Sequence, residues 1–149
     1  MEESAKPGPE HDPEATIQLA DCYRAGAEML LAPGAGGLVR PPGRLNAIHA
    51  IELYLNAYLL HHGTTPKDVR KLQHDIATRW RKAQEYGLAL RPKTARHLED
   101  LSENREYLHV RYPRDDALAV CELNRLTATL VQVADAVHAA LARPGIAAA

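Results

Sequence analysis

Hydrophobic residues recur at helical spacing in several stretches of the chain. The clearest stretch covers residues 45–61, where apolar positions three and four apart form a continuous arc without an internal Gly or Pro. An earlier stretch covers residues 13–32 and follows Asp12, a residue type that caps helix N-termini well. Residues 33–43 lie between the two and combine glycines with prolines, so we expect a loop there.

The pattern over residues 66–88 allows two interpretations. Apolar residues recur at helical spacing through the stretch, which favours a single helix. His74 and Asp75 fall outside that stripe, so a break near Gln73, with Asp75 capping a second helix, is equally open.

A further helix is expected over residues 94–110, and it carries a charge on its apolar stripe. At 100° per residue, Arg105 shares one face with Leu101 and Leu108, so its guanidinium would point toward the core. A half-buried charge needs a counter-ion or a ligand. Glu52, at the margin of the apolar arc of residues 45–61, is the expected counter-ion.

The last helix is expected to place apolar residues from Ala119 to Leu141 in alternating steps of three and four. This spacing forms an apolar seam that packs along one face of a partner helix. With no credible strand, the sequence predicts an all-α fold, an antiparallel bundle of about five helices. We expect one domain over residues 13–142, a flexible N-terminal tail over 1–12 and a C-terminal tail over 143–149.

Composition narrows the classes of function. The net charge of −1 over 149 residues gives no global field for nucleic acid, so a phosphate site would need a local group of Arg and His side chains. Cys22 and Cys121 stand alone and predict neither a disulfide framework nor a zinc site, and we expect no metal or cofactor. No signal peptide or membrane span is evident, so a cytoplasmic protein that does not enter membranes is expected. The glycines of residues 33–43 match neither GxGxxG nor a GK[ST] ending, which argues against a phosphate loop.

Three short segments, taken together in their order and spacing, resemble the HEPN family (higher eukaryotes and prokaryotes nucleotide-binding). The segments are AIELYLNAYLLHHG over residues 50–63, His74-Asp75-Ile76 through Ala83 to Gly87-Leu88, and Arg111-Tyr112-Pro113. The resemblance covers about residues 44–140 and implies an all-helical bundle. Glu52 and His74 coincide with positions that recur in the family.

The resemblance also implies a chemistry. Many members are metal-independent ribonucleases of toxin–antitoxin and defence systems, in which an Arg holds the scissile phosphate and a His exchanges a proton with a ribose hydroxyl, often across a dimer interface. In the family roughly four to six residues separate the Arg from the His that follows it. In this chain Arg105 and His109 are separated by only three residues, and Asn104 precedes the Arg instead of following it.

Two other Arg and His pairs satisfy the family spacing formally. Arg44 and His49 do so at the start of the second helix, and Arg91 and His97 do so across a connector. Neither pair lies in the neighbourhood where the resemblance places the motif.

We therefore expect a non-catalytic HEPN-like module that binds a nucleotide or RNA, or a partner protein, through a groove with Glu52, His74, Arg105 and Arg111. One alternative is a metal-independent endoribonuclease of a toxin–antitoxin or defence system that uses Arg105 and His109. A second is a structural bundle that dimerises through its last helix. A homodimer is expected, and the resemblance implies a nucleotidyltransferase-like partner protein.

Overall fold

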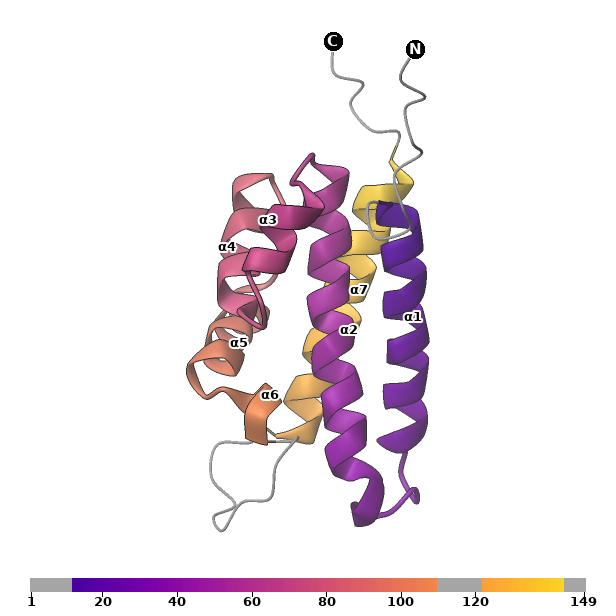
Figure 1. Cartoon of the computed structure of the whole chain (residues 1–149). Coiled ribbons are helices and arrows are strands. Elements are labelled where there is room, and N and C mark those ends of the chain that lie inside the picture. The colour runs from indigo at the N-terminus through magenta and orange to yellow at the C-terminus, as the bar shows by residue number, and fades with distance from the viewer. Residues whose placement is uncertain (1–11, 110–121, 144–149) are drawn as a thin grey trace, which may run out of the picture.

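The chain forms an all-α bundle in the computed structural model, which describes residues 12–109 and 122–143 (Figure 1). The predicted fold class is confirmed, and no strand occurs in the described ranges. Both predicted tails lie outside these residues, apart from Asp12 and Arg143. The helices are α1 (Pro13–Leu30), the short 3-10 helix η2 (Gly37–Val39), α2 (Arg40–His61), α3 (Pro66–Lys71), α4 (Ile76–Glu85), α5 (Pro92–Glu103), α6 (Glu106–His109) and α7 (Leu123–Ala142).

The helix α2 is central. It packs against α1 and α7 on one side and against α3 and α4 on the other, while α5 bridges α4 and α7 (Figure 1). The pairs α1/α2 and α4/α5 run antiparallel, whereas α2 and α7 point the same way (Figure 1). The arc of residues 45–61 is buried as predicted, with Ile51, Tyr54 and Leu55 fully enclosed.

The start of α2 corrects the sequence prediction. The helix begins at Arg40, so four residues of the expected loop belong to α2 and three more, Gly37–Val39, form η2. Pro41 and Pro42 are accepted there because the first turn of a helix needs no N–H donors. Gly43 lies so close to α1 that a Cβ at this position would stand 2.7 Å from Leu31 Cδ2. A small residue therefore lets the two helices cross closely.

The apolar seam of α7 packs inside the chain. Its residues Leu126, Leu130, Val133 and Val137 are at most 2 % exposed, and α7 contacts α2 and α5. The apolar seam that the three-and-four spacing predicts therefore packs against helices of this same chain. The expected part of this helix that precedes Glu122 lies outside the described residues.

The stretch over residues 66–88 forms two helices, which confirms the second interpretation. Gln73 takes a left-handed φ of 47° after α3. Asp75 then caps α4, accepting a hydrogen bond from the Thr78 backbone N–H at 3.0 Å. The chain is redirected at Gln73 before α4 begins.

The expected helix over residues 94–110 is wrong in its second half. It is divided into α5 and α6 at Asn104 and Arg105, and Arg105 has a left-handed φ of 49°. The break takes Arg105 off the apolar stripe, and its side chain is exposed. The buried charge in this region is Glu106, which is 1 % exposed and lies 3.3 Å from Arg44 Nη1.

Candidate ligand-binding site

A buried ion pair joins α2 to α4 and underlies the candidate site. Arg79 is 2 % exposed, and its Nη2 lies 3.5 Å from Glu52 Oε1. Its Nε donates to Asn56 Oδ1 at 2.6 Å, and its Nη1 donates to the carbonyls of Leu72 and Asp75 at 3.4 and 3.2 Å. Burial lowers the pKa of Arg79, with the charge of Glu52 opposing it, but a guanidinium stays charged at neutral pH. Arg79 therefore fixes the link between α3 and α4 onto α2.

The second oxygen of the same carboxylate faces outward. Glu52 Oε2 lies 3.3 Å from Nδ1 of His74, whose side chain is 40 % exposed. A carboxylate beside Nδ1 favours the tautomer with the proton on that atom, which leaves Nε2 available to a ligand. The imidazole also packs on Tyr107, with ring centroids 4.8 Å apart. His74 is thus oriented from both sides.

The adjoining backbone is tied together at the N-terminus of α4. Asp75 accepts hydrogen bonds from the backbone and hydroxyl of Thr78, and Ser102 Oγ lies 3.4 Å from Asp75 Oδ1 while accepting from the Ala77 N–H at 2.8 Å. Burial acts to raise the pKa of Asp75, but the hydrogen bonds from Thr78 and Ser102 and the charge of Arg81 lower it overall. Asp75 is ionised at neutral pH, and its oxygens hold α4 and α5 together.

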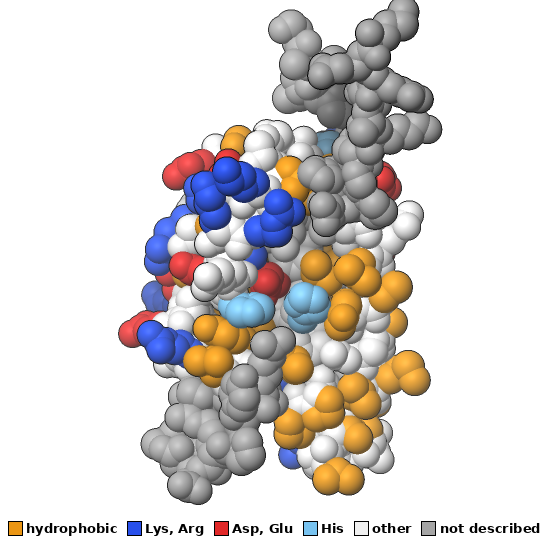
Figure 2. Space-filling model, in the orientation of Figure 1, with side chains coloured by type: hydrophobic (Ala, Val, Ile, Leu, Met, Phe, Trp, Pro, Cys, Tyr) orange, Lys and Arg blue, Asp and Glu red, His pale blue; other side chains and the backbone are white. Residues whose placement is uncertain are grey.

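These residues border one cavity of about 200 Å³, here called the His74 groove. Its lining residues are Leu72, Gln73, His74, Asp75, Ser102, Arg105 and Tyr107. Both non-glycine residues with left-handed backbone in the described ranges, Gln73 and Arg105, line it. On the face shown in Figure 2, histidine side chains lie near the centre, and Lys and Arg side chains gather above them. Helix α3, which leads into the groove at Leu72 and Gln73, carries the exposed Lys67, Arg70 and Lys71.

Three of the predicted site residues meet at this groove. His74 and Arg105 line it, and the carboxylate of Glu52 contacts Nδ1 of His74. The expected ion pair between Glu52 and Arg105 is wrong, because Glu52 pairs with Arg79 and His74. His109 is the last residue of α6, and its side chain, like all of Arg111, lies outside what the structure describes.

Arg79 is a neighbour of Glu52 at the candidate site that the sequence pattern did not predict. It lies three residues after Ile76 and four before Ala83, so it shares their apolar stripe. The adjacent Trp80 also fits the stripe, so the stripe can be read as fully apolar without Arg79. A charged residue between Ile76 and Ala83 was the available indication of a buried ion pair.

The two pairs with formal Arg and His spacing do not converge on a site. Arg44 pairs with Glu106, whereas His49 packs edge-on against Tyr23 of α1 with ring centroids 4.5 Å apart. His97 is fully buried beside α7, where its Nδ1 lies 2.6 Å from Thr129 Oγ1, while Arg91 is exposed before α5. Neither pair presents an Arg and a His to one ligand.

Comparison with known proteins does not assign the chain to a family. No family model, no curated protein and no solved structure matches it. Within residues 12–109 and 122–143, no group of three or more His, Cys, Asp or Glu side chains is placed to hold a metal ion. In the same ranges, no helix combines the length and the hydropathy needed to cross a membrane.

Proposed function

We propose that the chain is a non-catalytic module that binds RNA, or the phosphate of a nucleotide, in the His74 groove. The observation that carries the proposal is that His74 and Arg105, which come from two different helix junctions, line one cavity. Among the described residues no carboxylate pairs with Arg105, whose guanidinium is exposed. A guanidinium and an imidazole that converge from separate elements can contact one phosphate from two sides.

The size of the groove favours an RNA strand over an enclosed nucleotide. Sites that enclose a small molecule usually measure about 300–1,000 Å³, and the His74 groove measures about 200 Å³. It has room for a phosphate group and part of a sugar. The exposed Lys67 and Lys71 of α3 extend positive charge away from it, with Asp68 Oδ1 3.5 Å from Lys71 Nζ, and the half-buried ring of Tyr107, which packs on His74, borders the groove as an aromatic surface. A strand lying across this face would use all three features.

Both carboxylates at the groove serve the fold. Asp75 caps α4 and Glu52 is shared between Arg79 and His74. A binding role follows most simply from this arrangement, because neither carboxylate is left over as a second proton-transfer group.

One observation favours the ribonuclease alternative. The carboxylate of Glu52 orients His74 so that its outer nitrogen is available beside Arg105. An imidazole that exchanges a proton with a ribose hydroxyl, with an Arg holding the phosphate, is the chemistry of metal-independent RNA cleavage. In that case His74, rather than His109, would act as the acid or base.

Binding is tested by fluorescence anisotropy with a short labelled single-stranded RNA in buffer containing EDTA. We expect Arg105→Ala to weaken binding about five- to tenfold, the effect of losing one charge-assisted contact. Arg96→Ala removes an exposed Arg of α5 outside the groove and is the matched control. Equal losses in both variants would contradict the proposal, because they would show only non-specific attraction.

Cleavage is tested on the same RNA by gel electrophoresis. We expect the RNA to stay intact with the wild-type protein. Shortening of the RNA that is lost in His74→Ala but kept in His97→Ala would replace the binding proposal with the ribonuclease alternative. The homodimer and the nucleotidyltransferase-like partner stay predictions, and sedimentation at several protein concentrations tests the former.

A further inference from the structure

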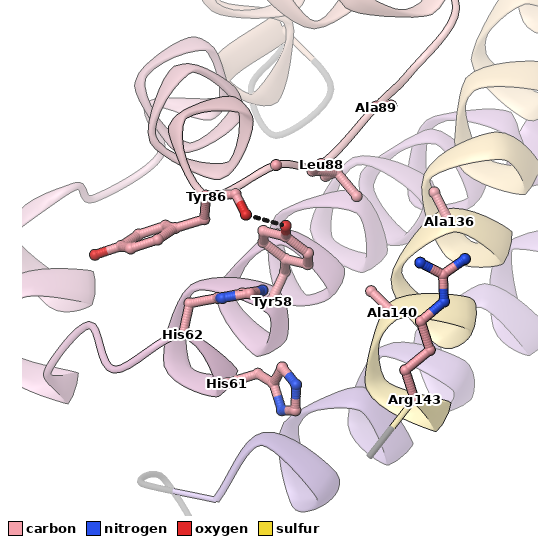
Figure 3. A pocket seen from close by; sticks show the side chains of 10 residues that line it. Tyr58, His61, His62, Tyr86, Leu88, Ala89, Ala136, Ala140 and Arg143 are labelled. Atoms are coloured by element: carbon pink, nitrogen blue, oxygen red, sulfur yellow. Dashed lines mark hydrogen bonds between the residues drawn. The ribbon is translucent and has the colours of Figure 1, made fainter. Parts of the chain in front are cut away.

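A second cavity lies at the other end of α4 from the His74 groove and has a volume of about 380 Å³. The groove adjoins Asp75 before α4, whereas this cavity adjoins Tyr86 just after it. It lies between the C-terminal ends of α2 and α7, with Leu88 and Ala89 along its upper side (Figure 3). Nothing in the proposed RNA-binding function uses this cavity.

One wall of the cavity is aromatic. His62 stacks on Tyr86 with ring centroids 5.3 Å apart and an interplanar angle of 15°, and its centroid lies 4.4 Å from that of Tyr58. Tyr58 is 3 % exposed and donates its hydroxyl to the Tyr86 carbonyl at 3.1 Å (Figure 3). This hydrogen bond fixes the Tyr58 ring, so the wall is largely preformed.

The opposite wall is made of small side chains. Ala136 and Ala140 of α7 face the aromatic wall across the cavity, and the side chain of Arg143 runs beside them (Figure 3). Alanines at these positions keep the cavity open, because larger side chains would fill it. The space between a ring surface and an alanine surface suits a flat apolar group.

The charges around the cavity have one sign. His61, His62 and Arg143 line it together with two tyrosines, and the set of lining residues contains no Asp or Glu. The rings of His61 and His62 lie 5.3 Å apart. Burial and then the neighbouring His61 lower the pKa of His62.

We propose that this cavity binds a small aromatic anion, an aryl carboxylate or an aryl phosphate. Its ring lies between Tyr58 and the alanines of α7, and its anionic group lies between His61 and Arg143. The volume is within the range of about 300–1,000 Å³ typical of small-molecule sites. The imidazoles and the guanidinium supply charge-assisted hydrogen bonds to the anion.

The ligand class is tested by NMR titration of the isotope-labelled chain with benzoate, phenyl phosphate and the neutral benzyl alcohol. We expect saturable shifts of the His61, His62 and Gly87 signals with at least one of the two anions, and binding of benzyl alcohol weaker by about tenfold or more. The tighter of the two anions identifies the anionic group. Binding of benzyl alcohol as tight as that of both anions, or no saturable shift with either anion, would overturn the proposal.

Two variants test the placement of the ligand. Ala140→Leu fills the cavity without changing its charge, and Arg143→Ala removes the guanidinium while keeping the cavity open. We expect each to weaken binding of the preferred anion about tenfold, with Arg96→Ala unchanged. Circular dichroism confirms that each variant is folded. Unaltered affinity in either cavity variant would overturn the proposed pose, and RNA binding measured on Ala140→Leu reports separately on the His74 groove.

Discussion

Gln73 and Arg105 share an uncommon backbone conformation and line the same cavity. Each follows the end of a helix, with φ angles of 47° and 49°, in the left-handed region that glycine occupies most easily. Residues with a side chain are strained there by roughly 1 kcal/mol or more each. Strain of this kind gathers at functional sites, which is consistent with a ligand role for the Arg105 side chain.

Replacing Arg105 by Gly separates strain from function. We expect Arg105→Gly to keep the free energy of unfolding unchanged or to raise it by up to about 1 kcal/mol, because relief of strain offsets the greater freedom of Gly in the unfolded chain. If the proposed RNA binding holds, we expect the same variant to lose RNA affinity. Urea unfolding monitored by circular dichroism measures the first effect. A loss of stability beyond about 1 kcal/mol would show instead that the Arg105 side chain supports the fold.

The buried pair of Glu52 and Arg79 is expected to matter more for stability than the exposed His74. Arg79→Met removes the ion pair and leaves three acceptors without their donor, so we expect the free energy of unfolding to fall by about 3 kcal/mol. His74→Ala should cost less than about 1 kcal/mol. Urea unfolding of the two variants and of Glu52→Gln/Arg79→Met makes the comparison. The double variant should have a higher free energy of unfolding than Arg79→Met, because it leaves no unpaired charge. A lower free energy of unfolding than that of Arg79→Met would contradict this account.

Buried His97 predicts a loss of stability in mild acid. Burial, and then the charge of Arg125, lowers its pKa from 6.5 to about 4, with Asp100 opposing the change, and its Nε2 has no hydrogen-bond partner among the described residues. Between these two values the unfolded chain binds a proton at His97 that the folded chain does not bind. The contribution of neutral His97 to the free energy of unfolding is therefore complete above the pKa of the unfolded chain. It falls as the pH drops toward the pKa of the folded chain.

The expected size of this effect is about 2 kcal/mol between about pH 7 and about pH 5. The measurement compares urea unfolding of the wild type with that of His97→Gln, whose amide can still hydrogen bond to Thr129. The free energy of unfolding of the variant should fall less than that of the wild type over this pH range, by that amount. Identical pH dependence in the two proteins would mean that His97 does not carry the effect.

The arrangement of long helices was predictable, because their apolar residues follow a period of 3.6 and their caps obey simple rules. Asp12 and Asp75 both cap helices as their positions indicate. The break at Arg105 was not predictable in the same way. The left-handed position that ends a helix is usually occupied by Gly or Asn. Here an Arg occupies it, and Asn104 lies one residue before it.

The candidate site was predictable in three of its residues, Glu52, His74 and Arg105, but not in how these residues pair. Glu52 was predicted from the margin of its apolar arc and from the family resemblance, His74 from the resemblance, and Arg105 from its expected place on an apolar stripe. Which carboxylate meets which cation depends on how α4 is rotated against α2, and helical spacing alone does not determine that rotation. Trp80 and Arg79 both fit the inner face of α4, and the structure buries both.

The shared carboxylate of Glu52 limits how this protein can change over evolutionary time. A chain that exchanges His74 for another residue still has a satisfied ion pair beneath the groove. A chain that exchanges Glu52 loses the partner of Arg79 and the support of His74 in one step. The surface of the groove can therefore diversify through His74, Arg105 and Tyr107 while Glu52 and Arg79 are inherited together.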